Sequence, residues 1–583
     1  MAQTVKSDNP QSGNQPPAPK EMSMEVRLLL AFLLMGAVMF LTPYFYKSPA
    51  PTSNKKTAPA AATVAPKDNP AAATQAAPPA ASPAPAADEA PPAANATPQQ
   101  AQPALAIDTD VYHVVFSNQG GTVRSWLLKK YKQNDGKPLE LVNTAAKLPY
   151  PFALEFPAEK PASDVNWKYY RQTVDDDGLG VAFEYSDGHT VINKTFRFEK
   201  NSYLSKVTTA VTIDGRPVPN MIEWLGGFGD FTVGNPAASQ RTVYYNATDT
   251  KLVEQKASAA KSGPASSSGE YTFSGIADPY FAAVFLPDND GMMQETTFSH
   301  TVPTSLEQKP EAFPGVAVSA GAANHLTLFV GPKDLDLLKR INPKLQTMVD
   351  FGWLSIIAKP LFIIVNWMND SFVHNFGWSI VLITIFLYII MFPLRLSSMK
   401  SMRKMQALKP QIDAINAKYK SLKFNDPRKA DQQQETMDLY KKNGVNPMGG
   451  CFPMVIQLLL VWPFYRVCTV AVEMRGASWL WVTDLSQPEH LPIKILPIAM
   501  IATQFLSTKM MPTPSADPSQ QRMMLLMPLI FGFMFYNLPS GLVLYYVTST
   551  VVSIAQQWFF NHTETAQQAA LSVQPPAKKS GRK

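Results

Sequence analysis

Residues 452–472 read FPMVIQLLLVWPFYRVCTVAV. An α-helix needs about 20 consecutive, mostly apolar residues to cross the hydrocarbon core of a bilayer. This stretch meets that length and carries one charged side chain, Arg466, well inside it. It therefore predicts a membrane-spanning helix and places the chain among the α-helical membrane proteins.

Four more apolar runs surround this one in roughly the last third of the chain. With 452–472 they predict a five-span core at 377–560, the other spans being 377–394, 495–509, 523–538 and 542–560. The third and fourth spans are short, because about 15 helical residues cover only about 22 Å of a hydrocarbon core of about 30 Å. We therefore expect local thinning of the bilayer or burial of these spans within the bundle.

The N-terminal part predicts an anchor and a linker. Residues 1–27 are polar, and 28–46 are apolar and end in aromatic residues without a prompt A-x-A-like cleavage site. We expect an uncleaved signal anchor there, preceded by a cytoplasmic N-terminus. Residues 47–104 are rich in Ala and Pro and have too few large apolar side chains to form a core, so we expect a linker.

Residues 105–340 alternate between apolar and polar side chains in short runs. The clearest runs are 111–116, 181–185, 194–198, 205–212 and 326–330, with Gly, Asn, Asp and Pro between them. This pattern predicts an all-β sandwich. We expect a loop at the Ser/Ala/Gly-rich 257–269, and a β turn rather than a nucleotide-binding loop at Gly226-Gly227-Phe228-Gly229-Asp230.

The distribution of basic residues predicts the orientation. The loop 395–450 holds twelve basic residues and five acidic ones, whereas the loop 473–491 holds Arg475 as its single Lys or Arg. The positive-inside rule puts the first loop, the N-terminus and the basic tail 561–583 in the cytoplasm, and the β domain outside. The amphipathic stretch 348–368, interrupted by Lys359-Pro360, is too polar to span comfortably and predicts an interfacial helix.

Arg466 is the strongest candidate for a functional side chain. A charge at that depth costs about 2.5–3.5 kcal/mol on insertion scales. No acidic residue lies deep in another predicted span, so we expect Arg466 to face a water-filled groove rather than a buried ion pair. A snorkelling arginine is the alternative. Polar residues of other spans line the same groove in this interpretation: Thr384, Tyr388, Gln457, Tyr545, Tyr546, Ser549 and Gln556.

The cytoplasmic loop predicts a helical hairpin at 399–443. Met402, Met405, Leu408 and Ile412 recur at three- and four-residue spacing, which marks one face of a helix. This stripe suits either a self-packed hairpin or an exposed docking surface for apolar partners. We slightly favour the docking surface.

Composition excludes several classes of protein. The net charge of +7 comes from Lys and Arg beside apolar runs, which favours membrane lipids over specific nucleic acid as a partner. Two cysteines, Cys451 and Cys468, give no disulfide framework and make a zinc site improbable. Because the sequence contains no P-loop, zinc-protease or nucleophile-elbow motif, we expect neither catalysis nor a cofactor.

Several motifs resemble one known family. Residues 446–457 fit NPxGGCxPxxxQ, and 539–545 fit PSGLxLY. Other matches follow in order: Phe392-Pro393-Leu394, Ser401-Met402, Lys404-Met405, Leu439-Tyr440, Glu473-Met474-Arg475 and Asp484-Leu485-Ser486. From about 326 to 560 the chain resembles the YidC/Oxa/Alb family of membrane protein insertases. With its anchor, linker and outer β domain it is similar to the Gram-negative YidC type, whose periplasmic domain is a β-supersandwich.

The resemblance implies a function and partners. It implies an inner-membrane insertase and chaperone that inserts and helps fold membrane proteins through a hydrophilic groove, without nucleotide hydrolysis. It implies nascent membrane proteins as substrates, action alone or with the Sec translocon, and ribosome contact through the basic loop and tail. A periplasmic scaffold for membrane assembly and a small-solute transporter are the alternatives, although no internal repeat supports the transporter.

One position departs from the family. The groove arginine of the family belongs to the span equivalent to 377–394, where this chain has Tyr388 in that register. The family position that matches Arg466 is usually aromatic. We therefore expect the two side chains to be exchanged, with Arg466 supplying the positive charge of the groove.

Overall fold

The computed structural model describes residues 100–233, 235–288, 292–304, 309–419, 428–445, 452–510 and 518–572. The predicted anchor, most of the linker, the end of the tail and Cys451 lie outside these residues. The hairpin residues 407–445 form a separate unit from the β domain and the other helices.

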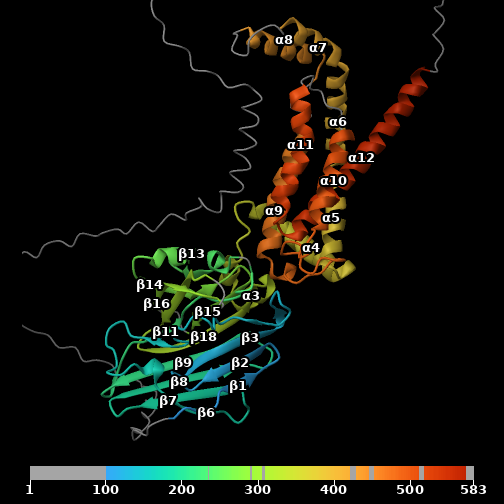
Figure 1. Cartoon of the computed structure of the whole chain (residues 1–583). Helices are drawn as coiled ribbons and strands as arrows, with labels where there is room; N and C mark the ends of the chain where they lie inside the picture. The colour runs from blue at the N-terminus through green and yellow to red at the C-terminus, as the bar shows by residue number, and fades with distance from the viewer. Residues whose placement is uncertain are drawn as a thin grey trace, which may run out of the picture. The chain divides into compact units, whose positions relative to one another are not determined.

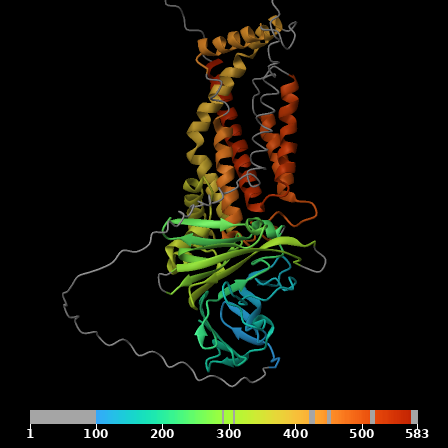
Figure 2. The same cartoon turned by 90° about the vertical axis from the view of Figure 1, so that its left-hand side faces the viewer.

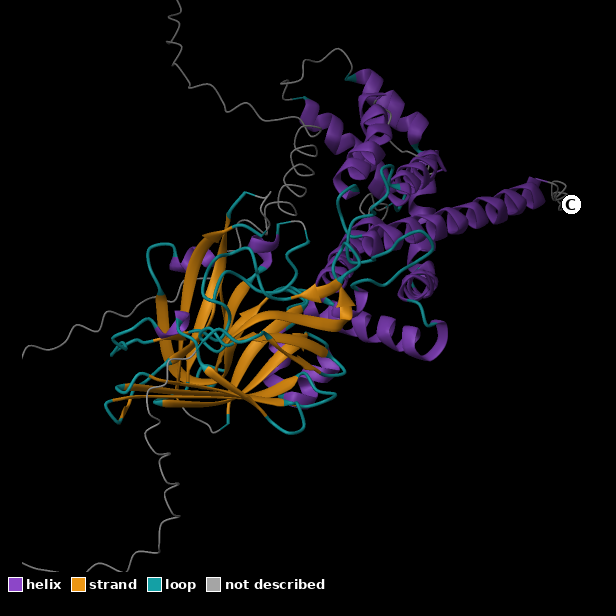
Figure 3. Cartoon of the chain, turned by 60° about the horizontal axis from the view of Figure 1, so that its bottom comes forward, coloured by secondary structure: helices purple, strands orange, loops and turns teal. Residues whose placement is uncertain are grey.

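Antiparallel strands make up the chain from Leu105 to Pro332, with only short helices among them (Figure 3). The strands are β1 Leu105–Asp108, β2 Tyr112–Ser117, β3 Thr122–Lys132, β4 Pro138–Glu140, β5 Leu154–Glu155, β6 Arg171–Val174, β7 Gly180–Ser186, β8 Thr190–Phe198, β9 Leu204–Ile213, β10 Arg216–Pro217, β11 Met221–Trp224, β12 Arg241–Asn246, β13 Lys251–Gln255, β14 Ala265–Ala277, β15 Phe281–Pro287, β16 Met292–Val302, β17 Glu311–Ser319 and β18 Ala323–Pro332. The prediction of an all-β domain is confirmed.

The strands form two sheets. One follows the order β1-β2-β3-β4, and the larger one runs β5-β11-β17-β16-β14-β15-β18-β9-β8-β7-β6, with β10, β12 and β13 joined at its side. The smaller sheet packs on β7 and β8 (Figure 1), because Phe116 lies 5.7 Å from Phe183 and 5.0 Å from Phe196 between ring centroids. Aromatic burial of this kind, together with Trp126 and Trp224, supplies the sandwich core.

The Ser/Ala/Gly-rich segment is not the loop that we predicted. Residues Ala257–Ala260 form a short 3₁₀ helix, and Ala265 begins β14, which pairs with β16. Small polar side chains pair across these strands, as Ser266 Oγ lies 2.8 Å from Thr296 Oγ1. The sequence pattern did not reveal this strand, because the strand is stabilised by cross-strand hydrogen bonds rather than by apolar side chains.

A buried carboxyl group lies beside this pairing. Glu295 is fully buried, and its Oε1 and Oε2 accept hydrogen bonds from Thr297 Oγ1 at 2.6 Å and from Ser267 Oγ at 3.3 Å. Burial raises the pKa of Glu295 to about 7, because the low-dielectric interior disfavours its charged form.

Helices follow the β domain. They are α3 Leu335–Ile341, α4 Ser355–Met368, α5 Phe376–Ile390, α6 Phe392–Ala407, α7 Lys409–Lys418, α8 Lys429–Lys442, α9 Phe452–Val470, α10 Ile495–Met510, α11 Pro518–Phe535 and α12 Ser540–Ser572. Helices α5, α9, α10, α11 and α12 fall on the five predicted spans, and the orange and red ones run side by side in Figures 1 and 2.

Length and composition single out few complete spans among the described residues. The continuous helix 355–373 is long and apolar enough to cross a membrane, and a second span results if α5 and α6, bent by 60°, count as one. Helices 459–470, 495–510 and 526–535 are shorter apolar helices. The stretch predicted as an interfacial helix at 348–368 becomes helical only at Ser355, and its helix continues to Val373.

The hairpin unit contains α7 and α8. Lys418 Nζ, at the end of α7, and Tyr419 Oη, just after it, donate hydrogen bonds to Glu435 Oε1 on α8 at 2.6 and 2.8 Å. The exposed docking stripe that we favoured is wrong for most of its members, because Met405, Leu408 and Ile412 are buried and Met402 is half-buried. Apolar side chains at helical spacing bury one face against their surroundings, which is the self-packed alternative.

Candidate substrate groove

The start of α12 positions one wall of the site. Helix α12 packs against α5, α9 and α10. Its first residues are bound by the loop between α9 and α10. Ser540 Oγ donates to Gln487 O at 2.8 Å, and Gly541 N donates to Leu485 O at 2.9 Å. A Cβ on Gly541 would lie 2.9 Å from Cys468 Sγ, so only glycine fits this close approach. The Pro-Ser-Gly sequence thus both begins α12 and sets it against α9.

A small cavity of about 20 Å³ lies between α5, α6 and α9. Its lining brings together two predicted groove residues, Tyr388 and Gln457, with a cation that the sequence analysis assigned to the cytoplasmic loop, Arg395. Among the described residues, the lining consists of Tyr388, Met391, Leu394, Arg395, Ile456, Gln457 and Leu460. The charged group of this cavity is therefore Arg395.

Arg395 is held by neutral groups of α12 and α5. Its Nη1 donates to Ser553 Oγ and to Gln556 Oε1, the latter at 3.2 Å. Its guanidinium carbon lies 5.5 Å from the centroid of the Tyr388 ring, and Gln556 Nε2 donates to Tyr388 O at 2.9 Å. Within the described ranges no carboxylate pairs with Arg395. Its positive charge is thus oriented but not neutralised.

The other predicted groove residues divide into two groups. Gln457 Nε2 donates to Ser549 Oγ at 3.5 Å, and Tyr546 Oη donates to Gln504 Oε1 at 3.4 Å, so these side chains join helices across the bundle. Thr384 donates to Ile380 O of its own helix at 2.6 Å and takes no part in the cavity lining.

Tyr545 behaves differently. Its ring stacks on Phe464 with centroids 4.0 Å apart, and its buried hydroxyl has no hydrogen-bond partner among the described residues. An unpaired buried hydroxyl is costly. The nearest polar group to this hydroxyl is the side chain of Tyr388, which lines the cavity.

Arg466 is not in the cavity, and the expectation that it lacks an acidic partner is wrong. Its Nη2 donates to Asp350 O and lies 3.3 Å from Asp350 Oδ2. Asp350 precedes α4 and lies in none of the predicted spans, which is why a search for acids inside spans missed it. Gln457 and Arg466 are nine residues apart on α9, or about 13 Å along the helix axis, so they belong to different levels of the bundle.

A helical-spacing argument could have identified Arg395. It follows Tyr388 by seven residues, close to two turns, and so shares a helix face with it. The bend between α5 and α6 does not destroy this relation. The charge count that oriented the loop had already assigned Arg395 to the cytoplasm.

Comparisons with known proteins agree with this architecture. The family described as 60Kd inner membrane protein matches residues 367–568, and the YidC periplasmic domain family matches residues 104–364. A membrane protein insertase YidC from Syntrophus aciditrophicus is 34% identical, covering 92% of this chain and 99% of that protein. One from Bordetella avium is also 34% identical, covering 81% and 85%. A crystal structure of an active YidC insertase with its first transmembrane domain resolved is 20% identical, covers 78% of this chain and 92% of that one, and has a TM-score of 0.35.

The matched families define an inner-membrane protein with a periplasmic β domain. The chain belongs to the YidC family of membrane protein insertases. The resemblance that the motifs indicated is confirmed.

Proposed function

We propose that the chain inserts membrane proteins into the inner membrane through the cavity between α5, α6 and α9, with α12 behind it. Arg395 supplies the positive charge of this groove. The observation that carries the proposal is that Arg395 lines the cavity and, among the described residues, has only neutral hydrogen-bond partners. Arg466 does not have this role, because Asp350 already pairs with it.

The physical basis is a shorter path for polar substrate segments. A hydrophilic flank of an incoming protein must cross the apolar core, where each unpaired polar group costs several kcal/mol, about 2–7 for one amide or hydroxyl. The groove places Arg395, Tyr388 and Gln457 along part of that path, and a cation without a carboxylate partner attracts acidic flanks. The apolar segment of the substrate then enters the lipid with a favourable transfer free energy. This sequence of events requires no nucleotide hydrolysis.

The proposal includes partners and topology. Nascent membrane proteins are the substrates, and the Sec translocon is a partner for some of them. The basic residues of the loop and tail contact the ribosome and anionic lipids. The N- and C-termini are cytoplasmic, the core has five spans in addition to the anchor, and the helix 355–373 lies along the interface. Trp353, Ile356 and Trp367, all strongly exposed, support this last placement.

Insertion assays with matched substrates test the proposal. Two reporter proteins would differ only in the charge of the translocated tail, acidic or neutral. Arg395→Ala is expected to reduce insertion of the acidic reporter about tenfold and that of the neutral one about twofold, since about 1.4 kcal/mol corresponds to a factor of ten. Arg395→Lys keeps the charge and should retain most of the activity.

Arg466→Ala is the matched control in the same assay. It removes an arginine from a neighbouring level of the bundle without emptying the cavity. Equal losses for Arg395→Ala and Arg466→Ala, or equal losses for both reporters, would contradict the assignment of the groove charge to Arg395.

A further inference from the structure

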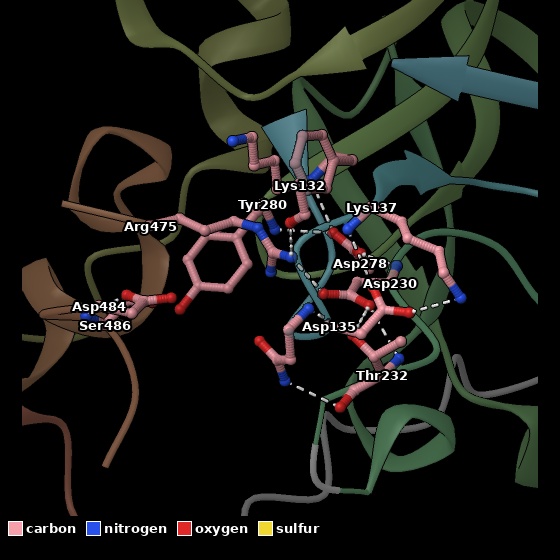
Figure 4. A network of polar contacts seen from close by, with 12 residues as sticks. Lys132, Asp135, Lys137, Asp230, Thr232, Asp278, Tyr280, Arg475, Asp484 and Ser486 are labelled. Carbon is pink, nitrogen blue, oxygen red and sulfur yellow. Dashed lines mark hydrogen bonds and ion pairs between the residues drawn. The ribbon is translucent and has the colours of Figure 1, made fainter. Parts of the chain in front are cut away.

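An arginine in the loop that follows α9 contacts the β domain. Arg475 follows α9, and its side chain is 4% exposed. Its Nη2 forms an ion pair with Asp230 and donates to Lys132 O at 3.1 Å (Figure 4). The Asp230 side chain is 1% exposed, so both charges are removed from water. A buried pair of this kind persists only when its geometry is fixed by further contacts.

The β domain supplies those contacts. Asp230 Oδ1 accepts hydrogen bonds from Thr232 N at 2.8 Å and Thr232 Oγ1 at 2.6 Å, and Asp230 N donates to Asp278 Oδ2 at 3.0 Å. The guanidinium carbon of Arg475 lies 5.4 Å from the centroid of the Tyr280 ring, within reach of a cation–π interaction. Asp230 is therefore held by groups of the β domain as well as by Arg475.

The glycine-rich segment 226–230 builds this socket. Gly229 has φ +95°, and a Cβ there would lie 2.0 Å from Asp278 Oδ2. Gly227 has φ +93°, and its Cβ would lie 2.6 Å from Phe313 Cδ1. The segment predicted as a β turn is an irregular bend whose amides bond to distant residues, Gly227 N to Pro314 O and Gly229 N to Leu141 O. Its glycines have a specific consequence. They let the backbone approach Asp278 and Phe313 closely enough to present Asp230 to Arg475.

The loop that carries Arg475 also holds the start of α12. Leu485 N donates to Ala477 O at 3.0 Å, Gly541 N donates to Leu485 O at 2.9 Å and Ser540 N donates to Gln487 O at 2.8 Å. On the β-domain side, the Tyr280 hydroxyl points toward Asp484 and Ser486 of the same loop (Figure 4). Contacts thus run without interruption from Asp230 through residues 475–487 to α12.

We propose that the Arg475–Asp230 ion pair is a latch through which the β domain fixes the first turn of α12, and thereby positions the groove wall during insertion. Among the described residues, the polar contacts of Arg475 and Asp230 include no residue of the cavity lining, so both are positioning residues. The consequence for insertion rests on the proposed function of the groove. The consequence for α12 does not.

Hydrogen exchange on the full chain in lipid nanodiscs tests the latch directly. Asp230→Asn and Arg475→Gln each leave one buried charge unpaired. Each is expected to raise exchange of the Ser540 and Gly541 amides at least tenfold, while exchange in β8 and β9 changes less than twofold. The double variant Asp230→Asn/Arg475→Gln removes both charges and should recover at least half of the protection, as coupled residues do in a double-mutant cycle.

Two further variants keep the test decisive. Arg475→Lys retains the charge and the fold, and should raise exchange at Ser540 and Gly541 about threefold. Arg197→Gln breaks the half-exposed pair with Asp177 elsewhere in the β domain and should leave both amides unchanged. Unchanged protection of Ser540 and Gly541 in every folded latch variant would overturn the proposal. If exchange at Ser540 and Gly541 rises while insertion stays normal, the ion pair does fix α12. The same result would contradict the role of the α12 wall in insertion.

Discussion

The contact of Arg475 with the β domain and the groove around Arg395 use the same residue type in opposite ways. Arg475 has a buried carboxylate partner, Asp230, which is itself held by Thr232. Arg395 is bound by the neutral side chains of Ser553 and Gln556. A neutralised arginine fixes two elements relative to each other, whereas an arginine with neutral partners keeps its charge available for an incoming group. The structural arginine is therefore distinguished from the functional one by the charge of its bonding partners, and not by its position within an apolar run.

The largest expected effect concerns the neutralised pair. Asp230→Ala leaves the Arg475 guanidinium buried without its carboxylate, which should lower the free energy of unfolding by about 3–5 kcal/mol. Denaturant titration of the full chain in detergent measures this, with the exposed-pair variant Asp177→Ala as control. A loss no larger than that of the control would show that the Arg475 pair contributes little, and the contrast with Arg395 would disappear.

A second effect tests whether burial in the β domain raises the pKa of the Glu295 carboxyl group and so makes stability depend on pH. The pKa of Glu295 is raised from 4.5 to about 7 by burial. The folded protein therefore binds an extra proton between these values, and that contribution to stability is present below pH 4.5 and lost as pH rises through about 7. Relative to Glu295→Gln, the wild-type chain should lose about 2–3 kcal/mol over this range. Parallel pH profiles of the two proteins would refute the raised pKa.

A smaller effect is expected at Tyr545, which lies in the bundle outside the cavity lining. Tyr545→Phe removes a buried hydroxyl that has no partner among the described residues and keeps the ring that stacks on Phe464. Stability should rise or stay within about 1 kcal/mol of the wild type. Insertion should fall about threefold if the free hydroxyl binds polar groups of the substrate. A stability loss above about 2 kcal/mol would show that the Tyr545 hydroxyl already has a hydrogen-bond partner.

The smallest effect belongs to Arg466. Its carboxylate partner Asp350 has a side chain that is 66% exposed, and exposed pairs contribute about 0–1 kcal/mol. Asp350→Asn should therefore change the melting temperature by less than about 4 °C, on the scale of about 2–4 °C per kcal/mol. Reporter insertion should stay within twofold of the wild type. A tenfold loss of insertion would show that Arg466 takes part in insertion.

The sequence predicted the elements better than their partners. Apolar runs and alternation located the five core helices and the β domain, because burial of one face imposes those periods locally. They missed the first part of β14, whose Ser266 and Ser267 contribute hydrogen bonds rather than apolar area.

The site was predicted only in part, for a related reason. Tyr388 and Gln457 were identified and line the cavity, but the choice between Arg395 and Arg466 depended on acids and hydroxyls distant in sequence. Asp350 is 116 residues from Arg466, and Ser553 is 158 residues from Arg395. No periodicity within one segment encodes contacts at that separation.

Site-specific photo-crosslinking to a translating membrane protein tests the central claim most directly. A photoreactive residue would replace Met391, which lines the cavity beside Arg395, or Trp462, which lies near Arg466. The groove assignment predicts crosslinks to the nascent chain from position 391, reduced at least fivefold by Arg395→Ala, and few from position 462. Strong crosslinks from 462 that persist while those from 391 are absent would contradict it.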